Sequence, residues 1–130
     1  MAPDGADRMR IPFEYAIIRA VPRIERGEQV NVGVILYCQP RDFLVARTDL
    51  VADRLRALDP GVDLDGVHTA LRSWESTCAG AGPAGALRAG ERFRWLTSPR
   101  STVIQAGPVH TGLTFDPAAE LDRLLSLLVH

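Results

Sequence analysis

The sequence predicts an α+β fold, in which an antiparallel sheet of about five strands is covered by three helices. Two observations lead to this prediction. Strand-like runs come first, helical periodicity follows, and further strand-like runs and a last helix close the chain, an order that is typical of α+β domains. The 130 residues, of which 46% are hydrophobic, also suit one core. We therefore expect a flexible lead-in over residues 1–10 and a single domain over residues 11–130.

Three strands are expected in the N-terminal part. Residues 13–21 have the composition of a strand, and Pro22 ends it because proline cannot donate to a sheet. A polar connection leads to a second strand over residues 30–37, and a turn with proline at residues 39–42 leads to a short third strand over residues 43–47. Short connections favour antiparallel pairing, so the sequence predicts a three-stranded meander.

The hydrophobic period changes to that of a helix after Thr48. Thr48 or Asp49 can cap a first helix, which Pro60-Gly61 ends. A second helix carries one apolar stripe, made of Leu64, Val67, Leu71, Trp74 and Cys78. The last helix begins at Asp116-Pro117, an N-cap followed by a proline in the first turn, and its stripe consists of Leu121, Leu124, Leu125 and Leu128.

Two further strands are expected between the second and the last helix. Phe93 and Trp95 alternate with Arg92 and Arg94, which is the pattern of a strand with one buried face. Residues 101–106 continue as another strand after the break at Ser98-Pro99. Because alternation sends rings and arginines to opposite faces, the rings would pack inward and leave only a row of arginines outside.

Composition excludes several classes of protein. The net charge of −1 argues against a protein devoted to nucleic acid. Every basic residue is arginine, so Schiff-base chemistry and a P-loop lysine are excluded. No apolar run is long enough to span a bilayer, and Met1 to Arg10 lacks the apolar segment of a secretory signal. We expect a cytoplasmic protein that does not enter a membrane.

The two cysteines, Cys38 and Cys78, lie near no other cysteine or histidine at the spacing of metal ligands. In a reducing compartment they are expected to be small buried apolar residues. The motifs GxGxxG, HExxH, the Walker loop and the nucleophile elbow are all missing. We accordingly expect no metal and no cofactor, and we lean against an enzyme.

The second strand has an unusual polar content. Glu28, the only asparagine (Asn31) and Gly33 interrupt a run of valine and isoleucine. Strict alternation would place Asn31 and Gly33 on one face with Ile35 and Tyr37. Glycine inside a strand marks a bulge or the close approach of a backbone or ligand, and a buried amide needs hydrogen-bond partners. The two explanations are a bulge with a structural asparagine and a face that meets a ligand or partner.

Two other polar segments could carry chemistry. Arg100, followed by Ser101 and Thr102 in a proline turn, could grip phosphate or carboxylate, because guanidinium offers a fork of donors. The alternative is a solvated turn. His110 could act as an acid or base with Glu28 as its partner, although a lone histidine in a loop is commonly structural or exposed. The candidate ligand-binding residues are Asn31, Arg100, Ser101 and Thr102, and the candidate catalytic residues are Glu28 and His110.

Three motifs together resemble a known family. They are Tyr15 to Arg19 with Pro22, the run from Gly27 to Leu36 with its Glu-x-x-Asn-x-Gly pattern, and Ser98-Pro99-Arg100-Ser101-Thr102 followed by His110-Thr111-Gly112 and a leucine-rich helix. This order resembles the bacterial proteins of domain-of-unknown-function family 3037, from about Phe13 onward. The resemblance implies a stand-alone cytoplasmic protein, in some genomes encoded beside a HipA-like kinase, and it supplies no catalytic residues.

Our leading hypothesis is a small binding or accessory module that acts through a protein partner, with a HipA-like kinase as one such partner. It depends on the missing catalytic motifs and on the mixed strand face with Asn31, Gly33 and Tyr37. A homodimer is a special case, because the first two strands are apolar on both faces. The alternative is an enzyme or sensor for a phosphorylated small molecule or nucleic acid that uses Arg100, His110 and Glu28, and it is favoured if Glu28, Asn31, Arg100 and His110 surround one pocket.

Overall fold

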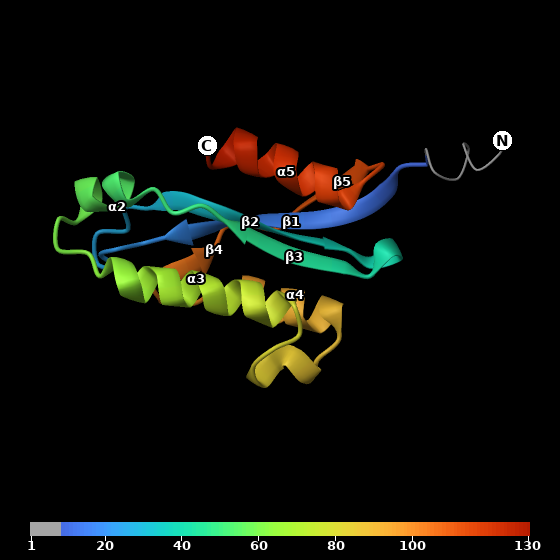
Figure 1. Cartoon of the computed structure of the whole chain (residues 1–130), viewed down its shortest axis with the longest axis horizontal. Helices are drawn as coiled ribbons and strands as arrows, with labels where there is room; N and C mark the ends of the chain where they lie inside the picture. Colours follow the sequence, from blue (N-terminus) through green and yellow to red (C-terminus); the bar gives the residue numbers. More distant parts are fainter. Residues whose placement is uncertain (1–8) are drawn as a thin grey trace.

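A five-stranded antiparallel sheet lies at the centre of the protein (Figure 1). The structure is a computed structural model and describes residues 9–130. The strands are β1 (Ile11–Ala20), β2 (Val30–Cys38), β3 (Phe43–Thr48), β4 (Ile104–Ala106) and β5 (His110–Thr114). Their order is β3-β2-β1-β4, and β5 pairs with the other end of the same edge of β1. The α+β prediction and the N-terminal meander are confirmed; the expectation for residues 1–8 lies outside the described residues.

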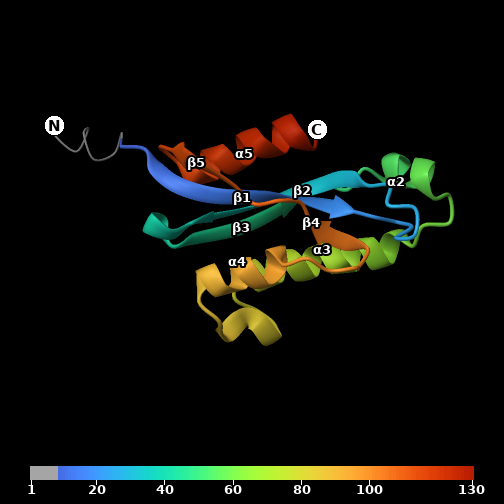
Figure 2. The ribbon, with the colours of Figure 1, turned by 180° about the vertical axis from the view of Figure 1, so that it is seen from behind.

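Helices cover both faces of the sheet (Figures 1 and 2). They are α2 (Ala52–Leu58), α3 (Leu64–Cys78), α4 (Ala89–Thr97) and α5 (Pro117–Leu128), with short 3-10 turns η1 (Gln39–Arg41) and η2 (Pro83–Ala86). The predicted stripe of α3 packs inward with α4 on one face, where Trp74, Phe93 and Leu96 are buried. Leu121 and Leu124 of α5 pack on the other face against Val34 and Leu36. The apolar faces of β1 and β2 are therefore covered.

A β-bulge interrupts β2. The pairing of β1 with β2 shifts between Ile18 and Arg19, which leaves Val32 as an extra residue. Val32 and Ile35 consequently belong to the core on the α3 side, whereas Val34 belongs to the core on the α5 side. The expectation that alternation continues unbroken along this strand is wrong, because one inserted residue reverses the faces of everything before it. The bulge itself is one of the two explanations that the sequence left open.

The segment around Phe93 is a helix and not the predicted strand. Phe93 and Leu96 are buried and lie three residues apart, as on one face of a helix, whereas Trp95 is 48% exposed. The Glu91 carboxylate accepts a hydrogen bond from the Arg88 backbone N–H at 3.2 Å, which stabilises the first turn. Residues 9–130 thus contain four α-helices, and the fifth strand is β5, whose residues the sequence had placed in a polar loop.

The ends of two further elements also differ from the prediction. Neither Thr48 nor Asp49 caps α2, because Thr48 belongs to β3 and Val51 occupies the N-cap without a side-chain hydrogen bond. β4 is only three residues long, since the hydroxyl of Thr102 donates to Ile104 O and forms a turn where a strand was expected. Both differences are local and leave the layers unchanged.

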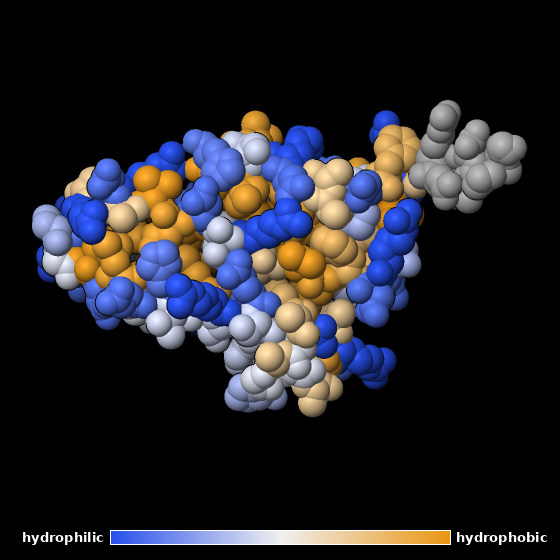
Figure 3. Space-filling model, viewed as in Figure 1, coloured by the Kyte–Doolittle hydropathy of each residue, from blue (hydrophilic) through white to orange (hydrophobic). Residues whose placement is uncertain are grey.

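The surface mixes polar and apolar residues. In the view of Figure 1, hydrophobic areas are broken up by hydrophilic side chains (Figure 3). An exposed ion pair joins Arg47 of β3 to Asp122 of α5. Among the helices of residues 9–130, none has the length and apolarity needed to cross a bilayer.

Candidate functional site

The unusual polar residues of β2 are used by the fold itself. Asn31 donates a hydrogen bond from Nδ2 to Leu128 O at 3.0 Å, which holds the last turn of α5 against the sheet. A Cβ atom on Gly33 would lie 2.6 Å from Arg47 O, so β2 approaches β3 there too closely for a side chain. The structure thus gives both residues an architectural role, whereas a ligand role for Asn31 stays a prediction.

The two candidate catalytic residues lie apart. Glu28 precedes β2, and its carboxylate forms an ion pair with Arg26 Nε at 2.8 Å in the β1–β2 connection. His110 begins β5, is exposed, and packs its ring against Tyr15 with 5.2 Å between ring centroids. The structure therefore gives His110 an aromatic neighbour and Glu28 a cation, and it does not bring the two together.

Arg100 lies in the α4–β4 connection and lines a cavity of about 350 Å³. Its guanidinium is 5.2 Å from the ring centroid of Trp95 and 5.8 Å from that of Trp74, and it donates to Trp95 O. Glu28, Asn31 and His110 do not line this cavity. The hydroxyl of Thr102 is engaged in its own turn, and the exposed Ser101 also lies outside the cavity lining.

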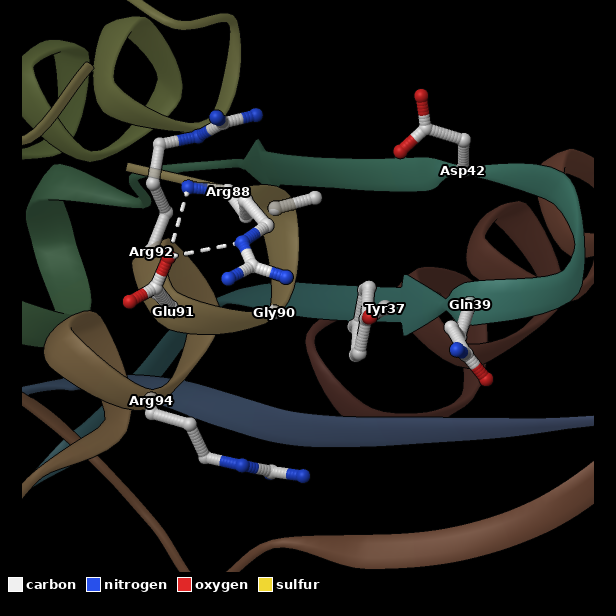
Figure 4. Close-up of a pocket in the computed structure, with 9 residues that line it drawn as sticks. Tyr37, Gln39, Asp42, Arg88, Gly90, Glu91, Arg92 and Arg94 are labelled. Carbon is white, nitrogen blue, oxygen red and sulfur yellow. Dashed lines mark hydrogen bonds and ion pairs between the residues drawn. The ribbon is translucent and has the colours of Figure 1, made fainter. Parts of the chain in front are cut away.

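A larger concave surface, of about 810 Å³, lies between the end of β2 and the start of α4 (Figure 4). We call it the α4 groove. Tyr37 lies on the side of α4, Gln39 lies beyond it at the end of β2, and Asp42 lies across from them at the start of the neighbouring strand (Figure 4). The lining residues are Tyr37, Gln39, Asp42, Arg88, Ala89, Gly90, Glu91, Arg92 and Arg94.

The floor of the α4 groove follows from two close contacts. The ring of Tyr37 stacks on that of Phe93, with 5.5 Å between centroids. A Cβ atom on Gly90 would lie 2.9 Å from the Tyr37 hydroxyl oxygen, so only glycine lets α4 approach this ring so closely. Tyr37 is therefore packed against α4, with part of its surface in the groove.

Three arginines line the α4 groove, and their surroundings differ. Arg94 donates two hydrogen bonds to the Glu14 carboxylate, at 2.8 and 3.0 Å, and these bonds raise the pKa of Arg94. Arg92 donates to Leu87 O at 2.5 Å and to Cys78 O at 3.3 Å, so it holds the loop before α4. Arg88 is 93% exposed and lies 3.5 Å from Glu91. Arg88 and Arg94 are thus the cations that a ligand can reach.

The α4 groove continues toward β5. A second cavity, of about 240 Å³, shares Tyr37 and Gln39 with the groove and extends past Pro12 and Glu14 to Thr111. The two cavities together form an elongated surface that begins at the N-terminus of α4 and ends at the edge strand.

The row of arginines was identified from the sequence but placed on a strand, and so the groove was not predicted. The signal for a helix was the pair of Arg88 and Glu91, which lie three residues apart just before Phe93.

The cysteine thiols are poorly suited to chemistry. Both are buried and free, and burial raises the pKa of Cys38 and raises that of Cys78 to about 12. A thiol with so high a pKa carries almost no thiolate at neutral pH, and thiolate is the reactive form. Across residues 9–130, His, Cys, Asp and Glu side chains form no group of three that could hold a metal ion.

Comparison with protein families identifies the chain. A family model described as "Protein of unknown function (DUF3037)" matches residues 15–129, from within β1 to the residue after α5. No curated protein and no solved structure matches the chain. The resemblance read from the Glu-x-x-Asn-x-Gly strand and the Ser-Pro-Arg segment is confirmed over nearly the whole chain, and the protein belongs to the DUF3037 family.

Proposed function

We propose that this protein is a small cytoplasmic binding module that acts through a protein partner, and that the partner places an extended acidic segment in the α4 groove. The observation that carries the proposal is the groove itself, a concave surface of about 810 Å³ with two exposed guanidinium groups beside a partly buried tyrosine. A HipA-like kinase, which the family resemblance brings in, is the first partner to test.

The shape of the groove favours an extended segment over a compact ligand. The groove and the second cavity share Tyr37 and Gln39 and so continue into one another, ending beside Thr111 of β5. Extended segments bind along such surfaces and can add to an exposed strand edge. A rigid aromatic ring at the centre and arginine at the rim are typical of residues that carry binding energy at protein interfaces.

The charges of the groove favour an acidic partner. Arg88 projects almost fully into solvent, and Arg94 keeps 59% of its side chain exposed although it is paired with Glu14. Arg88 is free to form the two parallel hydrogen bonds that guanidinium makes with a carboxylate, which gives orientation as well as attraction, whereas the fork of Arg94 is already engaged by Glu14. Asp42, which also lines the groove, would repel an acidic segment that entered in the wrong register.

The experiment is affinity purification from the native host with a charge-reversed variant. Arg88→Glu reverses the most exposed cation of the groove, and Arg56→Glu on α2 is the matched control, since it makes the same change at another exposed arginine that is also paired with a carboxylate three residues away. We expect the wild type and Arg56→Glu to retain the same partner and Arg88→Glu to lose it by about tenfold or more. A wild type that purifies alone contradicts the partner, and equal retention by both variants contradicts the groove.

The alternative enzyme required Glu28, Arg100 and His110 in one pocket. Glu28 is paired with Arg26, and His110 packs on Tyr15 outside the cavity that Arg100 lines. No reaction is therefore proposed for this set of residues. The part of that hypothesis in which Arg100 binds an anion is supported by a different cavity, which is separate from the α4 groove.

A further inference from the structure

The cavity beside Arg100 contains positive charge without a matching negative charge. We call it the arginine cavity; it measures about 350 Å³ and lies where the α4–β4 connection faces the β4–β5 connection. Figure 2 shows the β4–β5 connection crossing in front of β1 on this side of the molecule. Its polar lining consists of Arg19, Arg100, Thr97 and Gln105, and no carboxylate of the described residues lines it.

Arg19 reaches the arginine cavity from β1. It lies opposite Gln105 of β4 in the sheet, and a Cβ atom on Gly107 would lie 2.8 Å from its Cζ. Because Gly107 has no side chain, the Arg19 guanidinium can lie directly against the backbone at this position. The Nε atom of Arg19 is buried and has no hydrogen-bond partner within residues 9–130.

Arg100 reaches the cavity from the opposite side and is held in place. Its guanidinium lies near the rings of Trp74 and Trp95, where the π-faces attract a cation, and one of its N–H groups is used by Trp95 O. A guanidinium carries five N–H donors, so several stay available. Gln105 is likewise fixed, because Nε2 donates to Thr102 O at 2.8 Å.

Neither arginine of the cavity has a carboxylate partner among the described residues. Ion pairs in the described part of the chain use eight other basic residues and leave out Arg19 and Arg100. A buried donor without a partner is costly, and two cations that share a cavity repel each other. A bound oxyanion would satisfy the Arg19 donors and neutralise both charges at once.

We infer that the arginine cavity is a binding site for a phosphate-type oxyanion, held between the guanidinium groups of Arg19 and Arg100. Free phosphate and the phosphate group of a small monoester share this chemistry, and the cavity of about 350 Å³ has room for more than the ion alone. The site is separate from the α4 groove, because the two cavities share no lining residue. The inference therefore stands or falls independently of the protein partner.

The test is a titration of the full chain with inorganic phosphate and, in parallel, with a ribose 5-phosphate series, against chloride at equal ionic strength. Arg19→Ala and Arg100→Met are the test variants, the second keeping an unbranched apolar stem against Trp74 and Trp95. Arg72→Ala is the matched control, because it removes the same charge from an exposed position of α3. Binding is measured by calorimetry and by the shift of the Arg19 Nε–H resonance.

We expect saturable phosphate binding in the wild type and in Arg72→Ala, with an affinity about tenfold or more lower in Arg19→Ala and Arg100→Met. Tighter binding of ribose 5-phosphate than of phosphate identifies a monoester as the ligand class, and equal binding identifies the free ion. A wild type that responds to phosphate no more than to chloride overturns the inference, as does an Arg72→Ala variant that loses as much affinity as Arg19→Ala. If Arg100→Met fails to fold, Arg19→Ala and the Nε–H resonance decide.

Discussion

Gly33 of β2 lies opposite Thr48 at the end of β3. A Cβ atom there would be 2.6 Å from Arg47 O and 3.1 Å from Thr48 Cα, which are backbone atoms of a paired strand and cannot move alone. Gly33→Ala should therefore lower the free energy of unfolding by roughly 1–3 kcal/mol, as overpacking does. Urea denaturation followed by circular dichroism measures this change.

Gly61→Ala is the matched control, since a Cβ atom at Gly61 would be 3.7 Å from its nearest neighbour, an ordinary contact. This substitution should change stability by less than about 0.5 kcal/mol. Equal effects of the two substitutions would mean that the contact with β3 does not explain the glycine.

Cys78 gives a pH dependence whose direction follows from its burial. Its pKa rises from the ordinary value of 9.0 to about 12 in the folded chain, because burial disfavours the thiolate. Below pH 9 the thiol is protonated in both states, and its contribution to stability is complete. As the pH rises from about 9 toward 12, the unfolded chain loses this proton and the folded chain keeps it, so stability falls by up to about 1.4 kcal/mol per pH unit.

The measurement compares urea denaturation of the wild type and of Cys78→Ala at about pH 8 and about pH 10.5. The wild type should lose more stability than the variant between the two pH values. Equal losses would show that the folded thiol ionises as easily as the unfolded one, and the burial argument for an inert thiol would then fail.

The sequence identifies Asn31 and Gly33 as unusual residues of a strand, but only the structure shows what each of them contacts. An isolated amide in an apolar strand must find a partner, and Asn31 finds it in Leu128, 97 residues further along the chain. Nothing in local sequence can identify a partner at that distance. Arg19 was passed over because one arginine in a strand is unremarkable until Gly107 and Arg100 are seen beside it.

At the scale of elements, α4 shows why a short alternating run is ambiguous. Phe93 and Trp95 are two residues apart, and two rings cannot distinguish a period of 2 from a period of 3.6. Tertiary contacts favour the helix: Leu96 is buried together with Phe93, and Arg94 pairs with Glu14 of β1. α3 and α5 were predictable because their apolar stripes repeat over 12 or more residues with Asp63 or Asp116 as cap.

α5 also offers a direct test of its N-cap. The Asp116 side chain accepts hydrogen bonds from Ala118 N at 3.0 Å and Ala119 N at 3.3 Å. Asp116→Ala should lower the free energy of unfolding by about 1 kcal/mol, because the two backbone donors lose their acceptor. Asp116→Asn should retain most of the stability, since its amide oxygen can accept the same bonds. If both variants were equally destabilised in urea, the hydrogen bonds would not be the reason.

At the scale of the whole molecule, helices close both faces of the sheet and leave an edge open. β5 pairs with β1 on one side only, and its neighbourhood exposes Leu113 by 59% and Phe115 by 48%. Unprotected strand edges pair with other chains. We predict that two chains pair along β5 at high micromolar concentration. The interface of this homodimer would be the β5 edge and not the apolar faces of β1 and β2 from which the sequence predicted it.

Light scattering of the wild type and of Leu113→Lys checks the prediction. The variant should be monomeric and about as stable as the wild type, because Leu113 makes little contact within its own chain. A wild type that stays monomeric at high micromolar concentration would contradict pairing along β5, and a dimeric Leu113→Lys would place the contact elsewhere.

The central claim, that the α4 groove holds a partner protein, is tested most directly by photo-crosslinking in the native host. A photoreactive residue is introduced at position 39, where the exposed Gln39 side chain lines the groove and the groove keeps its arginines, and at position 56 on α2 as the control. The proposed function predicts one defined adduct from position 39, identified by mass spectrometry, and none from position 56. No adduct from position 39, or the same adducts from both positions, would contradict it.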